Sequence, residues 1–133
     1  SSDLYSHYGA SKAWAESLAR MYWDKHGIET LALRIGSCLA QPRSARHLST
    51  WLSHADLCRL VDAGLVAPLI GFRVLYAVSA NSRRWWHNSV DAISVAVQDD
   101  ADECAGPRPD TLPQAPVDVR WQGGAYAEDH RGE

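Results

Sequence analysis

An amphipathic helix, a glycine and a short apolar strand follow one another near the start of the chain and limit the folds open to it. Between Tyr8 and His26 the apolar residues recur at spacings of three and four, the period of one helix face. Gly27 follows as a helix stop. Ile28–Ile35 contains the continuous apolar run Leu31–Leu33, which is typical of a parallel strand buried on both faces. Helix, glycine and buried strand form half of a βαβ crossover, so we predict an α/β fold with a parallel sheet.

The next part of the chain repeats the alternation of loop, helix and strand. Residues 36–52 are expected to form a long loop at the carboxyl end of the first strand, where open α/β sheets bind ligands. Ser53 is a candidate N-cap, with Asp56 at the capping-box position, for a second amphipathic helix that ends before Pro68. A second strand is expected at Phe72–Ser79. This order agrees with an α/β fold.

The pattern weakens after the second strand. Ser82–Ser89 is expected to be a polar loop that carries two adjacent tryptophans, and Asp91–Val97 fits either a short helix or a strand. Asp99–Val119 is acidic and rich in proline, which predicts a loop or a disordered tail. Trp121–Tyr126 is expected to be a terminal strand or a docking segment.

Size, charge and cysteine content narrow the class of protein. The 133 residues fit one domain, and the net charge of -3 argues against a nucleic-acid partner and against a polybasic membrane patch. No apolar run approaches the roughly 20 residues of a membrane span. Cys38, Cys58 and Cys104 lack the spacing of a zinc site or a disulfide framework, and the six histidines show no metal-ligand spacing. We therefore expect a reduced, cytoplasmic protein without a metal.

Tyr8 and Lys12 are the first candidate catalytic residues. Residues four apart lie on one face of a helix, so the phenol and the ammonium are expected to converge. A phenol has a pKa of about 10 and is a poor base at neutral pH, but a nearby ammonium favours the phenolate and lowers that pKa. The pair could then act as a general acid–base group. The same spacing also occurs by chance in solvated helices, so the spacing alone does not distinguish a catalytic pair from a structural one.

Several blocks in a fixed order are more specific than that spacing. The segment Tyr8–Tyr22 resembles the catalytic helix of the NAD-dependent epimerase/dehydratase family, the extended short-chain dehydrogenases. Leu31–Cys38, Arg46–His54 and Trp85–Ser89 resemble the uronate dehydrogenases of that family in the same order and at similar spacing. Trp121–Ala125 resembles the C-terminal segment of those enzymes. The resemblance implies a Rossmann-like doubly wound parallel sheet with a small substrate-binding region.

The resemblance also implies roles for single residues. Tyr8 would be the acid–base group, and Lys12 would hold the nicotinamide ribose and tune Tyr8. Ile35 would line the cofactor and Ser37 the substrate, while Arg46 would bind the substrate carboxylate, because a guanidinium binds a carboxylate through two hydrogen bonds. The implied reaction is oxidation of a hexuronate at C1 to an aldarate lactone, with hydride transfer to NAD.

Three further expectations follow from the resemblance. The sequence has no glycine-rich phosphate loop, so the NAD site is expected to be incomplete and the chain to be the C-terminal half of the fold, without the nucleotide-binding half. Residues 1–98 would form that half with its substrate loops, and residues 99–133 the acidic tail. Arg43 competes with Arg46 for the carboxylate. A sugar-nucleotide epimerase or dehydratase, a non-catalytic interaction module and a homo-oligomer all stay open.

Overall fold

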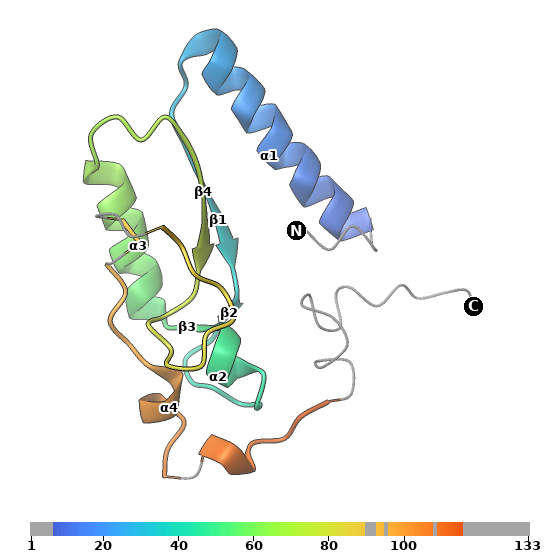
Figure 1. The fold of residues 1–133 in the computed structure, drawn as a ribbon, viewed down its shortest axis with the longest axis vertical. Coiled ribbons are helices and arrows are strands. Elements are labelled where there is room, and N and C mark those ends of the chain that lie inside the picture. The colour runs from blue at the N-terminus through green and yellow to red at the C-terminus, as the bar shows by residue number, and fades with distance from the viewer. Residues whose placement is uncertain (1–6, 90–92, 95, 108, 116–133) are drawn as a thin grey trace.

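The computed structural model describes residues 7–89, 93–94, 96–107 and 109–115. Helices and strands alternate through most of this length (Figure 1). They are α1 (His7–His26), β1 (Thr30–Ile35), β2 (Ser37–Cys38), α2 (His47–Thr50), β3 (Trp51–Leu52), α3 (His54–Val66), β4 (Phe72–Ala77), α4 (Ala101–Cys104) and the 3₁₀ helix η1 (Pro109–Thr111). The predicted segment at residues 121–126 lies outside the described residues, as do three of the seven residues of the predicted element at 91–97.

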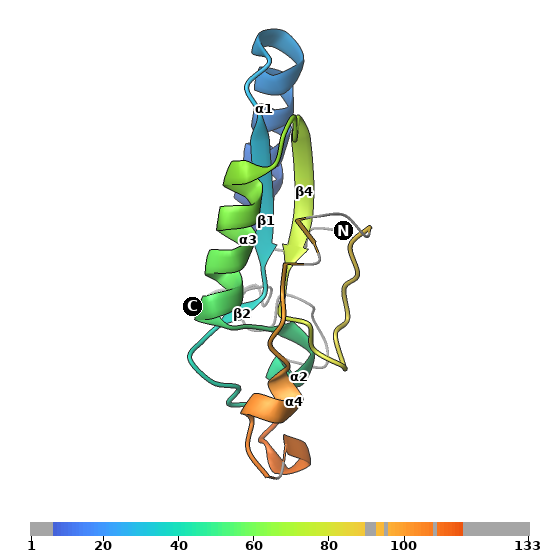
Figure 2. The same ribbon diagram turned by 90° about the vertical axis from the view of Figure 1, so that its left-hand side faces the viewer.

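A small parallel sheet with one helix on each face forms the centre of the structure. β1 and β4 pair in parallel, with Arg34 opposite Tyr76, as the crossover pattern predicts. Figures 1 and 2 show α1 against one face of this sheet and α3 against the other. The α/β prediction is confirmed.

The expectation that β1 is buried on both faces is wrong. Its first five residues are half-buried and Ile35 is 51% exposed. The apolar run predicts a strand covered by neighbours on every side. The described sheet containing β1 has two strands, so one edge of β1 carries no neighbouring strand among the described residues.

α1 begins and ends close to the predicted positions. Gly27 adopts φ +66° directly after the helix, a conformation that costs glycine little and that ends the helix before β1. The helix has no fully buried residue, and Trp14 and Tyr8 are 66% and 58% exposed. It contacts the sheet through long side chains, among them Arg20 over the ring of Phe72. None of the described helices has the length and apolarity needed to cross a bilayer.

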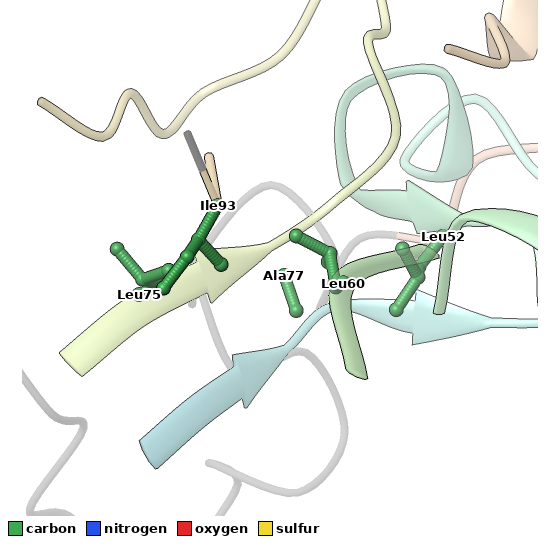
Figure 3. Packing of buried hydrophobic residues seen from close by; sticks show 5 residues of the cluster. All are labelled: Leu52, Leu60, Leu75, Ala77 and Ile93. Atoms are coloured by element: carbon green, nitrogen blue, oxygen red, sulfur yellow. The ribbon is translucent and has the colours of Figure 1, made fainter. Parts of the chain in front are cut away.

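The main core lies between α3 and the sheet. Leu52, Leu60, Leu75, Ala77 and Ile93 form one buried cluster, drawn in Figure 3. These side chains come from β3, α3, β4 and the segment after the polar loop, so the cluster joins parts of the chain that are distant in sequence. Burial of each leucine or isoleucine side chain contributes about 1.5–3 kcal/mol to folding.

The expected loop over residues 36–52 contains three short elements, which corrects the sequence prediction. β2 pairs with β3 in parallel, Ser37 opposite Trp51. Gly36 permits this pairing, because a Cβ atom there would lie 2.1 Å from the backbone oxygen of Thr50. The indole of Trp51, 1% exposed, donates to the carbonyl oxygen of Leu39 at 2.8 Å. Close packing and side-chain bonds therefore order this segment, and neither leaves a periodic pattern in the sequence.

α3 begins as predicted, but its first-turn carboxylate acts differently. The hydroxyl of Ser53 accepts a hydrogen bond from the Asp56 backbone N–H at 2.9 Å, which is the expected N-cap. A capping box would return the Asp56 carboxylate to the Ser53 backbone N–H, but that N–H donates to the Ser79 hydroxyl at 3.0 Å. The Asp56 carboxylate accepts instead from the backbone N–H groups of Gln98 and Asp99, at 2.8 and 3.0 Å.

The segment after residue 98 is also more ordered than its composition predicts. The side-chain carbonyl of Asn81 accepts from the Ala101 backbone N–H at 3.0 Å, and Ala101 is fully buried against Trp51 and Leu48. Asp100 caps α4 by accepting from the Asp102 N–H at 3.0 Å. The acidic, proline-rich composition therefore gives a wrong prediction for the first part of the expected tail, because tertiary contacts hold this part in place.

Candidate active site

The first candidate pair lies at the start of α1. The ammonium of Lys12 lies over the ring of Tyr8, 5.1 Å from the ring centroid, as the spacing of four predicts. Ser11 donates its hydroxyl to the carbonyl oxygen of Tyr8 at 2.7 Å, so it does not extend toward a ligand from this turn. The Tyr8 side chain is 58% exposed, so the face of the helix that carries this pair is open to an incoming molecule.

The second candidate group surrounds β2 and α2. Ser37 and Thr50 join their hydroxyl groups at 3.0 Å, and Thr50 donates to the backbone carbonyl of Arg46 at 3.1 Å. Because Thr50 donates its hydroxyl proton to the Arg46 carbonyl, Ser37 is the donor to the Thr50 hydroxyl in this arrangement. The hydroxyl pair thus links Ser37 to the residue that carries the candidate carboxylate-binding guanidinium. Thr50 was not predicted, and the sequence offers no signal for it.

Arg46 lies immediately before α2, and its side chain is placed by an aromatic ring. Its guanidinium carbon lies 5.0 Å from the ring centroid of Trp85. Arg43, the competing residue, is exposed, and its backbone N–H donates to the imidazole Nδ1 of His47 at 2.9 Å. The half-buried position and the ring beneath it give Arg46 the more defined geometry of the two arginines.

An ion pair connects α1 to the sheet two turns after Tyr8. Arg34 donates to both carboxylate oxygens of Glu16, from Nε and Nη2, each at 2.8 Å. Both side chains are largely covered, with 32% and 23% of their surface exposed. Arg34 also donates from Nη1 to the hydroxyl of Tyr76 at 3.2 Å. The sequence carried a signal for this pair, since Glu16 continues the four-residue spacing of Tyr8 and Lys12 and Arg34 interrupts an apolar strand.

The ion pair shifts the titration of both partners. The hydrogen bond from Arg34 lowers the pKa of Glu16 below its ordinary value of 4.5, although partial burial acts in the opposite direction. The hydrogen bond to Glu16 raises the pKa of Arg34, which remains a cation. Glu16 and Arg34 are therefore both charged at neutral pH.

We expect Glu16→Gln to reduce the unfolding free energy by about 1 kcal/mol at neutral pH, the upper end for a partly exposed pair. The folded pKa lies below the ordinary value of 4.5, so the carboxylate stabilises the fold above that pH. The contribution is lost as the pH falls through the lowered folded pKa. Urea unfolding between about pH 7 and about pH 3 should show wild type and variant converging in acid. Asp24→Asn, in an exposed pair with Arg20, is the control. A difference that stays constant across this range would contradict the assignment.

Other groups offer less to a ligand. The described residues contain no cluster of three or more histidine, cysteine, aspartate or glutamate side chains that could hold a metal. Cys38, Cys58 and Cys104 are free thiols, and burial raises the pKa of the Cys104 thiol, which disfavours its reactive thiolate. A groove of about 640 Å³ runs along β4, lined by Phe72–Tyr76 and His87–Ser89, and holds none of the candidate residues.

The two candidate groups lie on different elements but face one end of the sheet. α1 runs opposite to β1, so its first turn points toward the end where β1 terminates at Ile35 (Figure 1). β2 and α2 continue from that same end. In the sequence, Ile35 lies between the two groups. Its apolar side chain is 51% exposed and is available to a planar ligand. A parallel α/β sheet places its ligands at this carboxyl end of the strands.

Known proteins are similar to this chain in both sequence and fold. No protein-family model matches the chain. The chain is 42% identical to the uronate dehydrogenase of Agrobacterium fabrum over 126 residues, which cover 92% of this chain and 48% of that enzyme. The crystal structure of uronate dehydrogenase from Agrobacterium tumefaciens matches with a TM-score of 0.80 and 41% identity, over 92% of this chain and 47% of that one. A mutant of that enzyme complexed with NAD matches with a TM-score of 0.76 and 39% identity, over 91% of this chain and 47% of that one.

The matches confirm the resemblance predicted from the ordered motifs. The chain spans about half the length of the curated relatives that it matches, which fits the C-terminal half of their family. The structural similarity also confirms a fold of the uronate dehydrogenase type for the described residues.

Proposed function

Because the chain is homologous to the uronate dehydrogenases along about half of their length, we propose that it supplies the acid–base pair and the substrate loop of an NAD-dependent hexuronate oxidoreductase. The observation that carries this proposal is the ammonium of Lys12 over the exposed ring of Tyr8, on the first turn of α1. The substrates would be glucuronate or galacturonate in the cyclic form. The product would be the corresponding aldarate lactone.

In this proposal Tyr8 moves the proton. Its phenolate oxygen accepts the proton of the C1 hydroxyl while the C1–H bond breaks, and a C1=O bond forms to give the lactone. NAD supplies the hydride acceptor for this oxidation when it is bound. Lys12 stabilises the phenolate electrostatically, and the cation also suits a ribose hydroxyl.

The described residues fit the nicotinamide end of the cofactor. Gly9, Ala10 and Ser11 are small, so a bulky planar group can approach the first turn of α1. The exposed side chain of Ile35 could pack against such a group at the end of β1. The pyrophosphate would require a glycine-rich loop, which these 133 residues do not contain. The proposed cofactor contacts of this chain are therefore Tyr8, Lys12 and Ile35.

The substrate side is formed by the β2–α2 segment. Arg46 would bind the C6 carboxylate through two hydrogen bonds, and Ser37 would contact a sugar hydroxyl. The support for Arg46 is its defined position, with its guanidinium over Trp85 and its carbonyl bonded to Thr50. A neutral sugar lacks the group that this arginine would recognise.

We expect Arg46→Ala to reduce kcat/KM for glucuronate by about 100-fold or more in the full-length protein, meaning this chain joined to the nucleotide-binding half of a uronate dehydrogenase. The reason is that a charge-assisted pair shielded from water is lost. The loss should appear mainly in the KM for the uronate. Arg43→Ala is the matched control, and it should change kcat/KM by less than about threefold, as an exposed charge does. Steady-state formation of NADH measures both variants. If Arg43→Ala causes the larger loss, Arg43 binds the carboxylate and the assignment of Arg46 is wrong.

A further inference from the structure

The guanidinium of Arg46 packs on a cluster of aromatic side chains that has no role in the proposed acid–base pair or in the substrate loop. This guanidinium lies over Trp85, which is 43% exposed and belongs to a loop without helix or strand. A side chain on such a loop needs support to keep a fixed position. Trp85 meets Trp86 edge-to-face, with ring centroids 6.0 Å apart and an angle of 82° between the planes.

The second tryptophan is anchored to the central sheet. Trp86 stacks on Tyr76 of β4, with centroids 5.4 Å apart and planes only 6° from parallel. The loop is also tied to β4 by Asn88, whose side chain accepts from the Tyr76 N–H and donates to the Tyr76 carbonyl, both at 2.9 Å. Tyr76 is thus bound through its ring and through its backbone. The loop that carries both tryptophans therefore has a defined position on the sheet.

Tyr76 is also connected to α1, the helix that carries the proposed acid–base pair. Arg34 lies opposite Tyr76 in the sheet, donates to its hydroxyl at 3.2 Å and holds its guanidinium 5.4 Å from the ring centroid. Arg34 in turn binds Glu16 of α1 with two hydrogen bonds. Because Glu16 shares a helix face with Tyr8 and Lys12, one unbroken series of contacts runs from the proposed acid–base helix to Arg46.

We propose that Tyr76, Trp86 and Trp85 form a positioning stack that holds Arg46 at a fixed place relative to Tyr8, and that Trp85 thereby sets the preference for a substrate with a carboxylate. This inference rests on the proposed function. None of the three aromatic residues needs to touch the reacting atoms. Their effect is to keep the guanidinium oriented before the substrate arrives, so that less conformational freedom is lost on binding.

The test is a double-mutant cycle on the full-length protein with wild type, Trp85→Leu, Arg46→Ala and the double variant. Trp85→Leu should reduce kcat/KM for glucuronate about 3- to 30-fold, the range that a cation–π contact provides, mainly through the KM for the uronate. The KM for NAD should not change. In the Arg46→Ala background the same substitution should cost less than about twofold, because the side chain that it positions is gone. Trp85→Phe should restore most of the activity, since a ring remains under the cation.

Controls separate this inference from a structural effect and from the function itself. Arg84→Ala, on the same loop and bonded to His87, should leave all constants unchanged. If Trp85→Leu does not fold, Trp85→Gln takes its place with the same expected result. Equal losses in the two Arg46 backgrounds, or an equal rise in the KM for NAD, would overturn the positioning role while the wild-type activity stands. A folded wild type that does not oxidise uronates would overturn the proposed function and this inference with it.

Discussion

Tyr8→Phe is expected to reduce kcat for uronate oxidation by about 100- to 10,000-fold, the range that a positioned acid–base group contributes. The substitution removes one oxygen atom and keeps the ring on which Lys12 rests, so the helix and the cation–π contact should remain. The KM for the uronate should change little, because the proposed carboxylate contact lies on another element. Steady-state formation of NADH by the full-length protein measures both constants.

A second tyrosine on the same helix provides the control for that experiment. Tyr22 is 42% exposed, and its ring lies 5.6 Å from that of His26 at the other end of α1. Tyr22→Phe makes the same chemical change far from the proposed site and should leave kcat within about twofold of wild type. If Tyr8→Phe keeps more than a tenth of the wild-type kcat, another group transfers the proton.

Asp56→Ala is expected to cause the largest loss of stability, about 2–6 kcal/mol, because two backbone N–H groups lose a buried acceptor at about 1–3 kcal/mol each. The Asp56 carboxylate is fully buried and accepts from Arg59 at 2.6 Å. It also accepts from the backbone N–H groups of Gln98 and Asp99. Alanine leaves these donors without their acceptor and releases the segment that follows residue 97 from α3.

Urea unfolding of the variants measures this loss. Asp62→Ala is the matched control, because Asp62 is an exposed carboxylate on the same helix and should change the unfolding free energy by less than about 0.5 kcal/mol. Asp56→Asn, which keeps one acceptor oxygen, should fall between alanine and wild type. Equal stability of Asp56→Ala and Asp62→Ala would show that the buried contacts around Asp56 contribute nothing.

Local periodicity explains why the main elements were predictable. The spacing of apolar residues in α1 and the stop at Gly27 depend on neighbouring residues only, and both appear in the structure. The candidate pair on the first turn was predictable for the same reason, since one helix turn determines whether Tyr8 and Lys12 meet. The resemblance then supplied the roles, which spacing could not.

Contacts between distant segments were not predictable from those rules. The series from Glu16 to Arg46 depends on the pairing of Arg34 with Tyr76, and a single sequence does not reveal that register. β2 and β3 have two residues each, too few for any period to appear. α4 lies at the start of the acidic, proline-rich stretch, yet it is held by Asn81, which lies 20 residues before Ala101. Sequence patterns therefore predicted elements and missed what joins them.

We propose that this chain carries the acid–base and carboxylate-binding residues of a hexuronate dehydrogenase. The most direct measurement compares NADH formation by the full-length protein with glucuronate, galacturonate, glucose and a UDP-sugar. We predict rapid reduction of NAD with the two uronates, an aldarate lactone as the product and a kcat/KM for glucose lower by at least about 100-fold, since glucose has no carboxylate for Arg46. Conversion of the UDP-sugar without uronate oxidation would contradict the claim and favour an epimerase or dehydratase.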